Sequence, residues 1–428
     1  MIDIKLIREN KEFVKENNKK KFQEHKNTLV DEIYEDDILL RELQTEADAL
    51  KSERNKISDQ IGILMREQKK DEAEALKNKV SSMKEKIDEL EKKEEILRDQ
   101  IKNKMMLIPN IIADDVPIGE DDTKNVEEAC FGEPVVPNFE IPYHSEIMEH
   151  FNGLDKEAAG RVSGNGFYYL MGDIARLHSA VLAYARDFMI DKGFTYCIPP
   201  YMIRGEAVNG VMSFEEKEAM MYKIEGEDLY LIGTSEHSMI AKFKDQIIKE
   251  SELPITMTSY SPCFRKEVGA HGIEERGVYR IHQFEKQEMV VICKPEDSDE
   301  WYEKMWQFSV EMFRSLDIPV RKLVCCSGDL ADLKYRSCDI EAWSPRQKKY
   351  FEVCSCSNLT DAQARRLGIR YKNTTGEKVY AHTLNDTVIA PPRMLIAFLE
   401  NNLCVDGSVK IPKVLQPYMG GKEKIEIK

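Results

Sequence analysis

Residues 263–288 read CFRKEVGAHGIEERGVYRIHQFEKQE, a charged and alternating stretch with glycines near its centre at Gly269, Gly272 and Gly277. This pattern predicts two β-strands joined by a loop. On the first strand Arg265 and Glu267 share a face, because side chains two residues apart point the same way. One face of the second strand carries Arg280, His282, Phe284, Lys286 and Glu288. Its other face carries Ile281, Met289 and Val291, which can enter a core.

Two interpretations of this charged face are open. A solvated sheet face would explain the charge, but neither the aromatic Phe284 among cations and acids nor the glycine-rich loop. A nucleotide site explains both, since a guanidinium binds phosphate oxygens and a phenyl ring stacks on a base. The sequence contains no GxxxxGK[ST] phosphate loop, and SGNG at 163–166 is too weak a dinucleotide motif. Arginines on an antiparallel sheet are therefore the expected phosphate-binding groups.

The totals place the chain among soluble globular proteins of two or three domains. It has 428 residues, of which 42% are hydrophobic and 32% charged. No apolar run approaches the roughly 18–20 residues that cross a bilayer, so we expect no membrane partner. The opening MIDIKLIRENKEFVKEN resembles neither a signal nor a transit peptide, which predicts a cytoplasmic protein. The net charge of −15 argues against general coating of nucleic acids, and no DNA partner is expected.

Ten cysteines are scattered along the chain and do not form a disulfide framework. Reduced thiols packed as small apolar groups are the expected state. Cys354 and Cys356 could begin a metal site, but no second pair has ligand spacing. We therefore expect no zinc.

The first 108 residues contain no proline and one glycine, Gly62. Two apolar series there follow heptad spacing, each with one charged exception. The first is Leu43, Ala47, Leu50, Arg54, Ile57, Ile61 and Leu64, and the second is Leu76, Val80, Met83, Ile87, Leu90, Glu94, Leu97 and Ile101. They mirror one another about position 70, which favours two helices folded back on each other, with a turn in REQKKDEAE at 66–74. Such an arm can serve dimerisation or spacing, and residues 41–104 hold 16 basic and 16 acidic residues.

Pro109 and the acidic stretch ADDVPIGEDDTKNVEE mark a boundary after the arm. We expect a helical arm at 1–110 with its hairpin at about 37–104, a linker at 111–134, and a second domain at 135–428. In that domain residues 172–194 predict an amphipathic helix, whereas residues 194–203, 229–239 and 255–268 predict strands. Strands outnumber βαβ crossovers, so the fold class is α+β: a helical coiled-coil hairpin followed by a mixed, mostly antiparallel sheet flanked by helices.

FRKE, the glycine loop and RIHQFEKQE resemble motif 2 of the class II aminoacyl-tRNA synthetases, specifically of the seryl-tRNA synthetase family. KGFTYCIPPYM resembles motif 1, with Pro200 as its proline, and TLNDTVIAPPRMLIAFLEN resembles motif 3, with Arg393 as its arginine. GTSEHS resembles the family's Thr-x-Glu element, and FEVCSCSNLTDAQARRLGIRY resembles its metal and nucleotide stretch. IKLIREN and the helical arm fit the same family, so the resemblance covers nearly the whole chain.

The resemblance implies a catalytic domain at 135–428 that binds bent ATP on an antiparallel sheet. The implied catalytic residues are Arg265, Glu288 and Arg393. The implied ATP-binding residues are Arg265, Lys266, Glu267, Ile281, Phe284, Glu352, Val353, Cys354, Ser355 and Arg393. Arg265 would bridge the α-phosphate and the serine carboxylate, and Phe284 would stack on adenine. Glu352 and Ser355 would hold Mg²⁺, a task suited to hard oxygen donors.

The resemblance also implies a pocket for L-serine. Its residues would be Thr234, Ser235, Glu236, Arg265, Glu288, Asn385 and Thr387. Rejection of alanine requires polar groups that stay unpaired when the hydroxyl is absent, and rejection of threonine requires crowding at its methyl group. The implied reaction is formation of seryl-adenylate and transfer to the 3′ end of tRNA(Ser), with tRNA(Sec) as a further acceptor.

In this family the helical hairpin recognises the long variable arm of the tRNA, and motif 1 forms a homodimer. Recognition of shape and backbone needs only modest basic clusters, for which Arg66, Lys69 and Lys70 are the candidates.

Motif 3 departs from the family pattern, since Asp386, Pro391 and Pro392 stand where small glycines are usual. Proline removes a ladder donor, so the strand should break or lie at an edge here, or Pro392 should open the next helix. Cys354 also stands where serine is common. We expect these residues to border the serine and ATP sites.

Two alternatives use the same scaffold. One is a divergent paralogue that adenylates serine or a related small amino acid and passes it to an acceptor other than tRNA; such proteins usually lack the arm. The other is a non-catalytic relative, which would be marked by loss of Arg265, Glu288 or Arg393, and all three are present.

Overall fold

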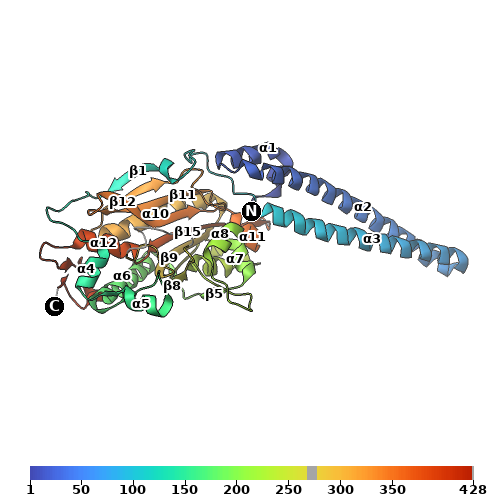
Figure 1. The fold of residues 1–428 in the computed structure, drawn as a ribbon. Coiled ribbons are helices and arrows are strands. Elements are labelled where there is room, and N and C mark those ends of the chain that lie inside the picture. The colour runs from blue at the N-terminus through green and yellow to red at the C-terminus, as the bar shows by residue number, and fades with distance from the viewer. Residues whose placement is uncertain (268–276, 427–428) are drawn as a thin grey trace. The chain divides into compact units, whose positions relative to one another are not determined.

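The computed structural model describes residues 1–267 and 277–426. The chain forms two compact units (Figure 1). One comprises Ile2–Lys19 and Gln23–Pro109, and the other comprises Met1, Lys20–Phe22 and Asn110–Lys428. Gly269 and Gly272 of the expected loop lie outside the described residues.

The first unit is helical, as the absence of proline predicts. It contains α1 Ile4–Lys20, α2 Asn27–Arg66 and α3 Lys70–Met105, and the last two pack along their length as a hairpin. Every residue of the two heptad series is buried or half-buried, whereas most of their neighbours are exposed. The turn lies at residues 67–69, within the predicted stretch. The predicted hairpin is confirmed.

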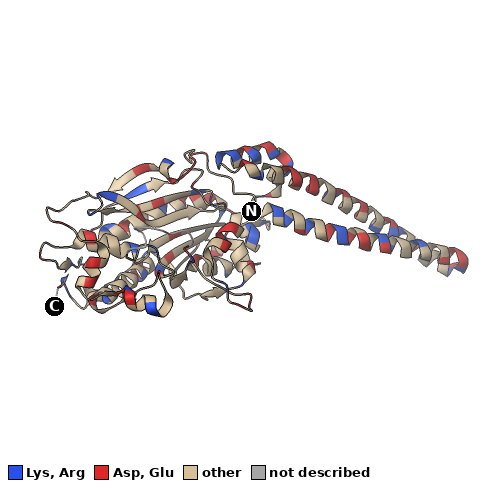
Figure 2. Cartoon of the chain, in the orientation of Figure 1, with Lys and Arg blue, Asp and Glu red and all other residues tan. Residues whose placement is uncertain are grey.

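Ion pairs also hold the two helices of the hairpin in antiparallel register. Lys79 Nζ lies 2.8 Å from a carboxylate oxygen of Glu53, and Lys86 Nζ lies 2.7 Å from one of Glu46. Figure 2 shows basic and acidic residues mixed along both helices. Exposed pairs of this kind contribute little because water and salt screen them, so the apolar seam supplies most of the stability.

The second unit is built on a sheet that, within the described residues, has eight strands. Their order is β1-β10-β11-β12-β15-β9-β8-β4, and only β4 and β8 pair in parallel. The strands are β1 Val126–Phe131, β10 Val320–Val324, β11 Arg336–Ser344, β12 Lys349–Asn358, β15 His382–Ile389, β9 Gln283–Cys293, β8 Ile255–Phe264 and β4 Thr195–Tyr196. The predicted mixed, mostly antiparallel sheet is confirmed.

Helices cover both faces of this sheet. On one face α6 Gly172–Asp191, α10 Ser298–Ser315 and α12 Arg393–Asn402 share a core with Met289 and Val291 of β9. On the other face α7 Gly205–Val211, α9 Ser235–Ala241 and α11 Ala362–Leu367 share a core with Val290 and Ile292. The alternation of β9 therefore continues into two separate cores, as a strand inside a covered sheet requires.

Shorter elements complete the second unit. The helices are α4 His144–His150, α5 Lys156–Ser163 and α8 Phe214–Met220. The strands are β2 Leu154–Asp155, β3 Tyr169–Leu170, β5 Met202–Ile203, β6 Tyr230–Leu231, β7 Ile247–Lys249, β13 Arg370–Lys372, β14 Lys378–Tyr380, β16 Val409–Lys410 and β17 Lys424–Ile425. Within the described ranges, every helix is too short or too polar to span a membrane.

Part of the expected linker differs from the prediction. Residues 126–131 form β1, which pairs with β10 at the edge of the large sheet. Asn110 and everything after it belong to the sheet unit. Acidic composition suggested a free connector, but alternating residues such as Val126 and Phe131 are enough to extend an antiparallel edge.

Three predicted strands are shorter than expected. In residues 255–268 β8 ends at Phe264, so Arg265 and Glu267 follow the strand instead of sharing one of its faces, and Arg280 and His282 precede β9. In residues 194–203 only β4 and β5 form, on either side of Pro199 and Pro200, because proline cannot donate to a ladder. In residues 229–239 only β6 forms, and α9 begins at Ser235. Thr234 caps that helix, its Oγ1 accepting a hydrogen bond of 3.2 Å from the backbone N–H of Glu236.

Candidate active site

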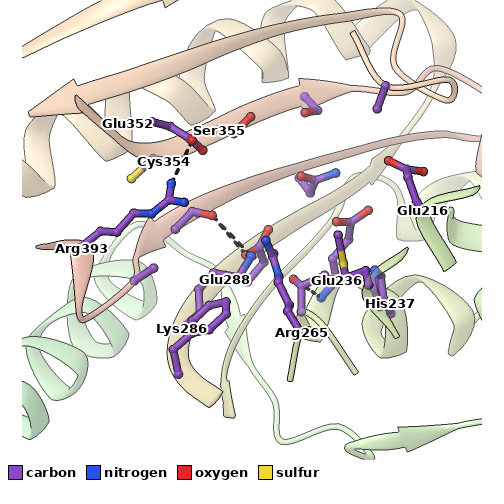
Figure 3. A pocket seen from close by; sticks show the side chains of 18 of the residues that line it. Glu216, Glu236, His237, Arg265, Lys286, Glu288, Glu352, Cys354, Ser355 and Arg393 are labelled. Atoms are coloured by element: carbon purple, nitrogen blue, oxygen red, sulfur yellow. Dashed lines mark hydrogen bonds and ion pairs between the residues drawn. The ribbon is translucent and has the colours of Figure 1, made fainter. Parts of the chain in front are cut away.

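A cavity of about 620 Å³ opens on the face of the sheet that α7 and α9 cover (Figure 3). It lies within the second unit. The sequence-predicted residues that line it are Thr234, Glu236, Arg265, Glu267, Ile281, Phe284, Glu288, Glu352, Val353, Cys354, Ser355, Asn385, Thr387 and Arg393. They come from β9, β12, β15, the start of α9, the start of α12, and the segments just after β8 and just before β9, so segments far apart in the sequence converge here.

β9 and the residues that follow β8 form one wall of the cavity. β8 and β9 pair in register, with Cys263 opposite Phe284. Phe284, Lys286 and Glu288 all line the cavity, as their shared face predicts. Ile281 lies before the first residue of β9 and lines the cavity too, rather than joining the core on the opposite face.

Two predicted site residues do not line the cavity. Ser235 is fully buried in the first turn of α9. Lys266 points its Nζ to the backbone oxygen of Glu218, 3.2 Å away. The two residues lie next to Thr234 and Arg265, which do line the cavity. Ser235 was expected to act through its backbone, so both assignments stay predictions.

Cationic side chains meet aromatic rings at the end expected to take adenine. The guanidinium carbon of Arg265 lies 5.3 Å from the ring centre of Phe284, and that of Arg393 lies 4.6 Å from the ring centre of Tyr279. Arg265 Nε also donates to the backbone oxygen of Gly233 at 3.2 Å. Planar cations and rings in these positions can stack on the two faces of a base and bind the phosphates of the same nucleotide.

Oxygen donors gather at the end expected to hold a metal ion. Glu352 and Ser355 of β12 both line the cavity, and Arg393 Nη1 lies 2.9 Å from a carboxylate oxygen of Glu352. Asp339 of β11 is directly opposite Ser355, and burial, with Glu352 nearby, raises the pKa of its carboxyl to about 7. A carboxylate and a hydroxyl are hard oxygen ligands, so the residues present fit Mg²⁺.

Buried carboxylates gather at the end expected to bind serine. Thr387 of β15 lies opposite Glu288 of β9, and its Oγ1 lies 3.5 Å from a Glu288 carboxylate oxygen. Lys286 forms an ion pair with the same carboxylate. Burial, together with the charge of Glu288, raises the pKa of Glu236 to about 7, while Gln363 donates to Glu236 at 2.9 Å. A pair of buried acids with one lysine is suited to bind an ammonium group and a hydroxyl.

Several cavity residues were not predicted. They include His237, Tyr279, Lys286 and Lys334, and Gln363 acts from behind the wall through Glu236. Lys286 shares the charged face of β9, so its spacing from Glu288 could have identified it. Lys334 and Gln363 lie in segments whose approach to the cavity depends on the tertiary fold.

The departures in motif 3 fall in two places. Pro391 and Pro392 line the cavity between the end of β15 and the start of α12, which confirms that the strand stops before them. Asp386 does not line it, so the expectation that it borders the site is wrong. Ser309 of α10 donates to the buried Asp386 carboxylate at 2.8 Å on the opposite face. β-Strand alternation places Asp386 away from Asn385 and Thr387.

The candidate tRNA-binding residues bracket the tip of the hairpin in the first unit. Arg66 ends α2, Lys70 begins α3, and Lys69 lies between them with its Nζ 2.9 Å from a Glu67 carboxylate oxygen. All three are exposed.

Comparisons with known proteins agree with this architecture. The family model for the seryl-tRNA synthetase N-terminal domain matches residues 1–112, and that for the tRNA synthetase class II core domain (G, H, P, S and T) matches residues 220–402. A serine–tRNA ligase of Methanoculleus marisnigri is 40% identical over 427 residues, which cover 99% of this chain and 100% of that protein.

Solved structures give the same result. The crystal structure of seryl-tRNA synthetase from Pyrococcus horikoshii complexed with ATP is 40% identical, has a TM-score of 0.94, and is matched over 100% of both chains. The cytoplasmic serine–tRNA ligase from Naegleria fowleri in complex with AMP is 32% identical with a TM-score of 0.89, over 100% of this chain and 99% of that one. Matches over the full length do not favour the paralogue without a tRNA acceptor. The chain belongs to the seryl-tRNA synthetase family of class II aminoacyl-tRNA synthetases.

Proposed function

We propose that this chain is a serine–tRNA ligase. It activates L-serine with ATP as seryl-adenylate and transfers the seryl group to the 3′ end of tRNA(Ser), with tRNA(Sec) as a further acceptor. The observation that carries this proposal is the single cavity that holds arginine–aromatic pairs at one end and buried carboxylates at the other. Similarity to a family member complexed with ATP supports the use of ATP here.

In the first step a serine carboxylate oxygen attacks the α-phosphorus of ATP, the bond to the β-phosphate oxygen breaks, and pyrophosphate leaves. Arg265 is placed between the two reactants, where its guanidinium neutralises both the attacking carboxylate and the α-phosphate. Phe284 stacks on adenine, and Arg393 covers the other face of the adenine or binds the γ-phosphate. These residues position the reactants and neutralise charge, which is most of what phosphoryl-type transfer requires.

Mg²⁺ bound by Glu352 and Ser355 would neutralise phosphate charge and so favour departure of pyrophosphate. The serine pocket works through hydrogen bonds. Glu236 and Glu288 accept from the substrate ammonium and hydroxyl, while Thr387 and Asn385 complete the pocket. Alanine would leave these buried groups without a partner, which costs far more binding energy than the loss of one contact.

The helical hairpin binds the tRNA, and two chains form a homodimer through motif 1, as the family membership supports. The ten free thiols are typical of a reducing compartment, which supports the cytoplasm as the site of action. DNA and membranes are not expected partners.

The deciding experiment is ATP–pyrophosphate exchange by the purified protein with serine, threonine, alanine and glycine in parallel, followed by aminoacylation of tRNA(Ser). We expect exchange with serine alone and subsequent charging of the tRNA. Exchange with another amino acid, or none, would reject the proposed specificity or activity.

A further inference from the structure

Lys334 is a cavity-lining lysine that the sequence analysis did not identify. It lies in the connection between β10 and β11, next to the residues expected to hold the metal. Its Nζ lies 3.4 Å from Ser355 Oγ and 3.3 Å from Ser337 Oγ. The two hydroxyls belong to neighbouring strands, so they fix the ammonium at the floor of the cavity.

The hydrogen bonds of this ammonium are weak and few. Both acceptors are neutral hydroxyls at long distances, and an ammonium can donate three hydrogen bonds. Within the described ranges, no carboxylate oxygen lies within 4.0 Å of Lys334 Nζ. Lys286, another lysine of the cavity, differs because it forms an ion pair with the carboxylate of Glu288.

Lys334 carries a positive charge as an ordinary lysine does, and its ammonium faces the cavity between the hydroxyls of Ser337 and Ser355. A charged group with donor capacity to spare, at the end of the cavity rich in hard oxygen donors, is suited to bind an anion.

We propose that Lys334 is a phosphate-binding residue, whose ammonium donates to the pyrophosphate part of ATP at the metal end of the cavity. The inference rests on the proposed function and deepens it. Ser355 links the two ideas, because a metal ion held by its hydroxyl, and the phosphates it would neutralise, would lie close to Lys334 Nζ.

A consequence for metal dependence follows. A metal ion at Ser355 and the ammonium of Lys334 repel each other, while both attract the same phosphate oxygens. Lys334 therefore takes over part of the charge neutralisation that a metal otherwise supplies. Binding of pyrophosphate without a metal should depend on Lys334 more strongly than binding with one.

A purely structural role for Lys334 would be to offset the charge of Asp339. That role predicts loss of thermal stability on substitution but no selective loss of anion binding. The two roles separate by comparing Lys334→Met with Lys334→Arg, which keeps the charge. Lys349→Met, an exposed lysine of the same strand as Ser355, is the matched control.

The experiment is calorimetric titration of the full chain with inorganic pyrophosphate and with ATP, in EDTA and in excess Mg²⁺, with thermal unfolding of each variant. Lys334→Met should weaken binding of pyrophosphate in EDTA by about tenfold or more, the usual effect of losing a charge-assisted hydrogen bond. The loss in Mg²⁺ should be smaller, Lys334→Arg should restore most of the affinity, and Lys349→Met should change nothing.

Equal affinities of the unchanged chain and a folded Lys334→Met variant would overturn the inference, as would a defect seen only in tRNA charging. If Lys334→Met does not fold, Lys334→Gln, which can still bond both hydroxyls, decides the question by the same titration. Failure of the unchanged chain to bind ATP at all would instead count against the proposed function, so the two failures are distinguishable.

Discussion

Arg393 Nη1 lies 2.9 Å from a carboxylate oxygen of Glu352, so the motif 3 arginine is paired with an expected metal ligand (Figure 3). Arg393 begins α12 and Glu352 lies in β12, and both side chains line the cavity. Binding of ATP with a metal ion should separate this pair, because the ion takes the carboxylate and the phosphates take the guanidinium. Until the nucleotide binds, the ion pair therefore balances the charges of both side chains.

The first prediction concerns Glu352→Gln. This change removes a charged ligand oxygen and the partner of Arg393, so the Mg²⁺ concentration that gives half-maximal exchange should rise by about tenfold or more. The KM for serine should change little, since Glu352 is not part of the serine pocket. Exchange measured across a Mg²⁺ series checks this, with the exposed Glu377→Gln as control. An unchanged Mg²⁺ requirement would remove Glu352 from the metal site.

The second prediction separates Arg265 from its neighbour Lys266. Arg265→Ala should lower serine-dependent exchange by about 100-fold or more, because it deletes the cation between the two reactants. Binding of tRNA should stay nearly intact. Lys266→Met should change exchange by no more than about threefold, since its Nζ points to the backbone of Glu218 outside the cavity. Equal losses of exchange and tRNA binding in Arg265→Ala would contradict its assigned role.

Periodicity was sufficient to predict the long elements of this fold. Heptad spacing located the seam of the hairpin and its turn, and alternation located the pairing of β8 with β9. Both patterns arise because one face of each element must be buried, so the sequence records them directly. The charged face of β9 was predicted for the same reason.

Periodicity does not predict the short elements or the residues at the floor of the cavity. Residues 229–239 carry apolar residues typical of a strand, but Thr234 caps a helix there, and a single capping bond outweighs weak propensity in so short a segment. Lys334 and Gln363 reach the site only through the crossing of distant segments. Local sequence carries no signal for such approaches, which is why these residues were missed.

The third prediction is a pH dependence that arises from Glu236. Its carboxyl has a pKa of about 7, raised by burial and by Glu288, with Lys286 and Lys334 acting in the opposite direction. Below pH 7 the carboxyl becomes protonated and loses the charge that attracts the serine ammonium. We therefore expect kcat/KM for serine to fall as pH drops below about 7, by up to about tenfold per pH unit for one proton.

The Glu236→Gln variant serves as the test of this assignment. Its kcat/KM for serine should be low and nearly independent of pH between about pH 6 and 8, roughly one unit on either side of the pKa of Glu236. Its KM for ATP should stay close to that of the unchanged chain. An inflection that persists in Glu236→Gln would assign the titration to another group of the coupled cluster, with Glu288 the next to test.

The last prediction concerns the hairpin, which should matter for tRNA and not for adenylate formation. Lys104 Nζ lies 2.8 Å from a carboxylate oxygen of Asp36. The two chain ends left by removal of residues 37–104 therefore lie close together and can be joined by a short glycine linker. This deletion should leave serine-dependent exchange within about threefold, because every cavity residue lies in the other unit. Charging of tRNA(Ser) should fall by about 100-fold or more, since the arm would supply most of the phosphate contacts.

A combined Arg66→Ala and Lys70→Ala variant tests the tip of the hairpin alone. It should cause a smaller loss of charging, and that loss should shrink as the salt concentration is raised. Unimpaired charging by the deletion would mean that the hairpin has another purpose, such as dimerisation.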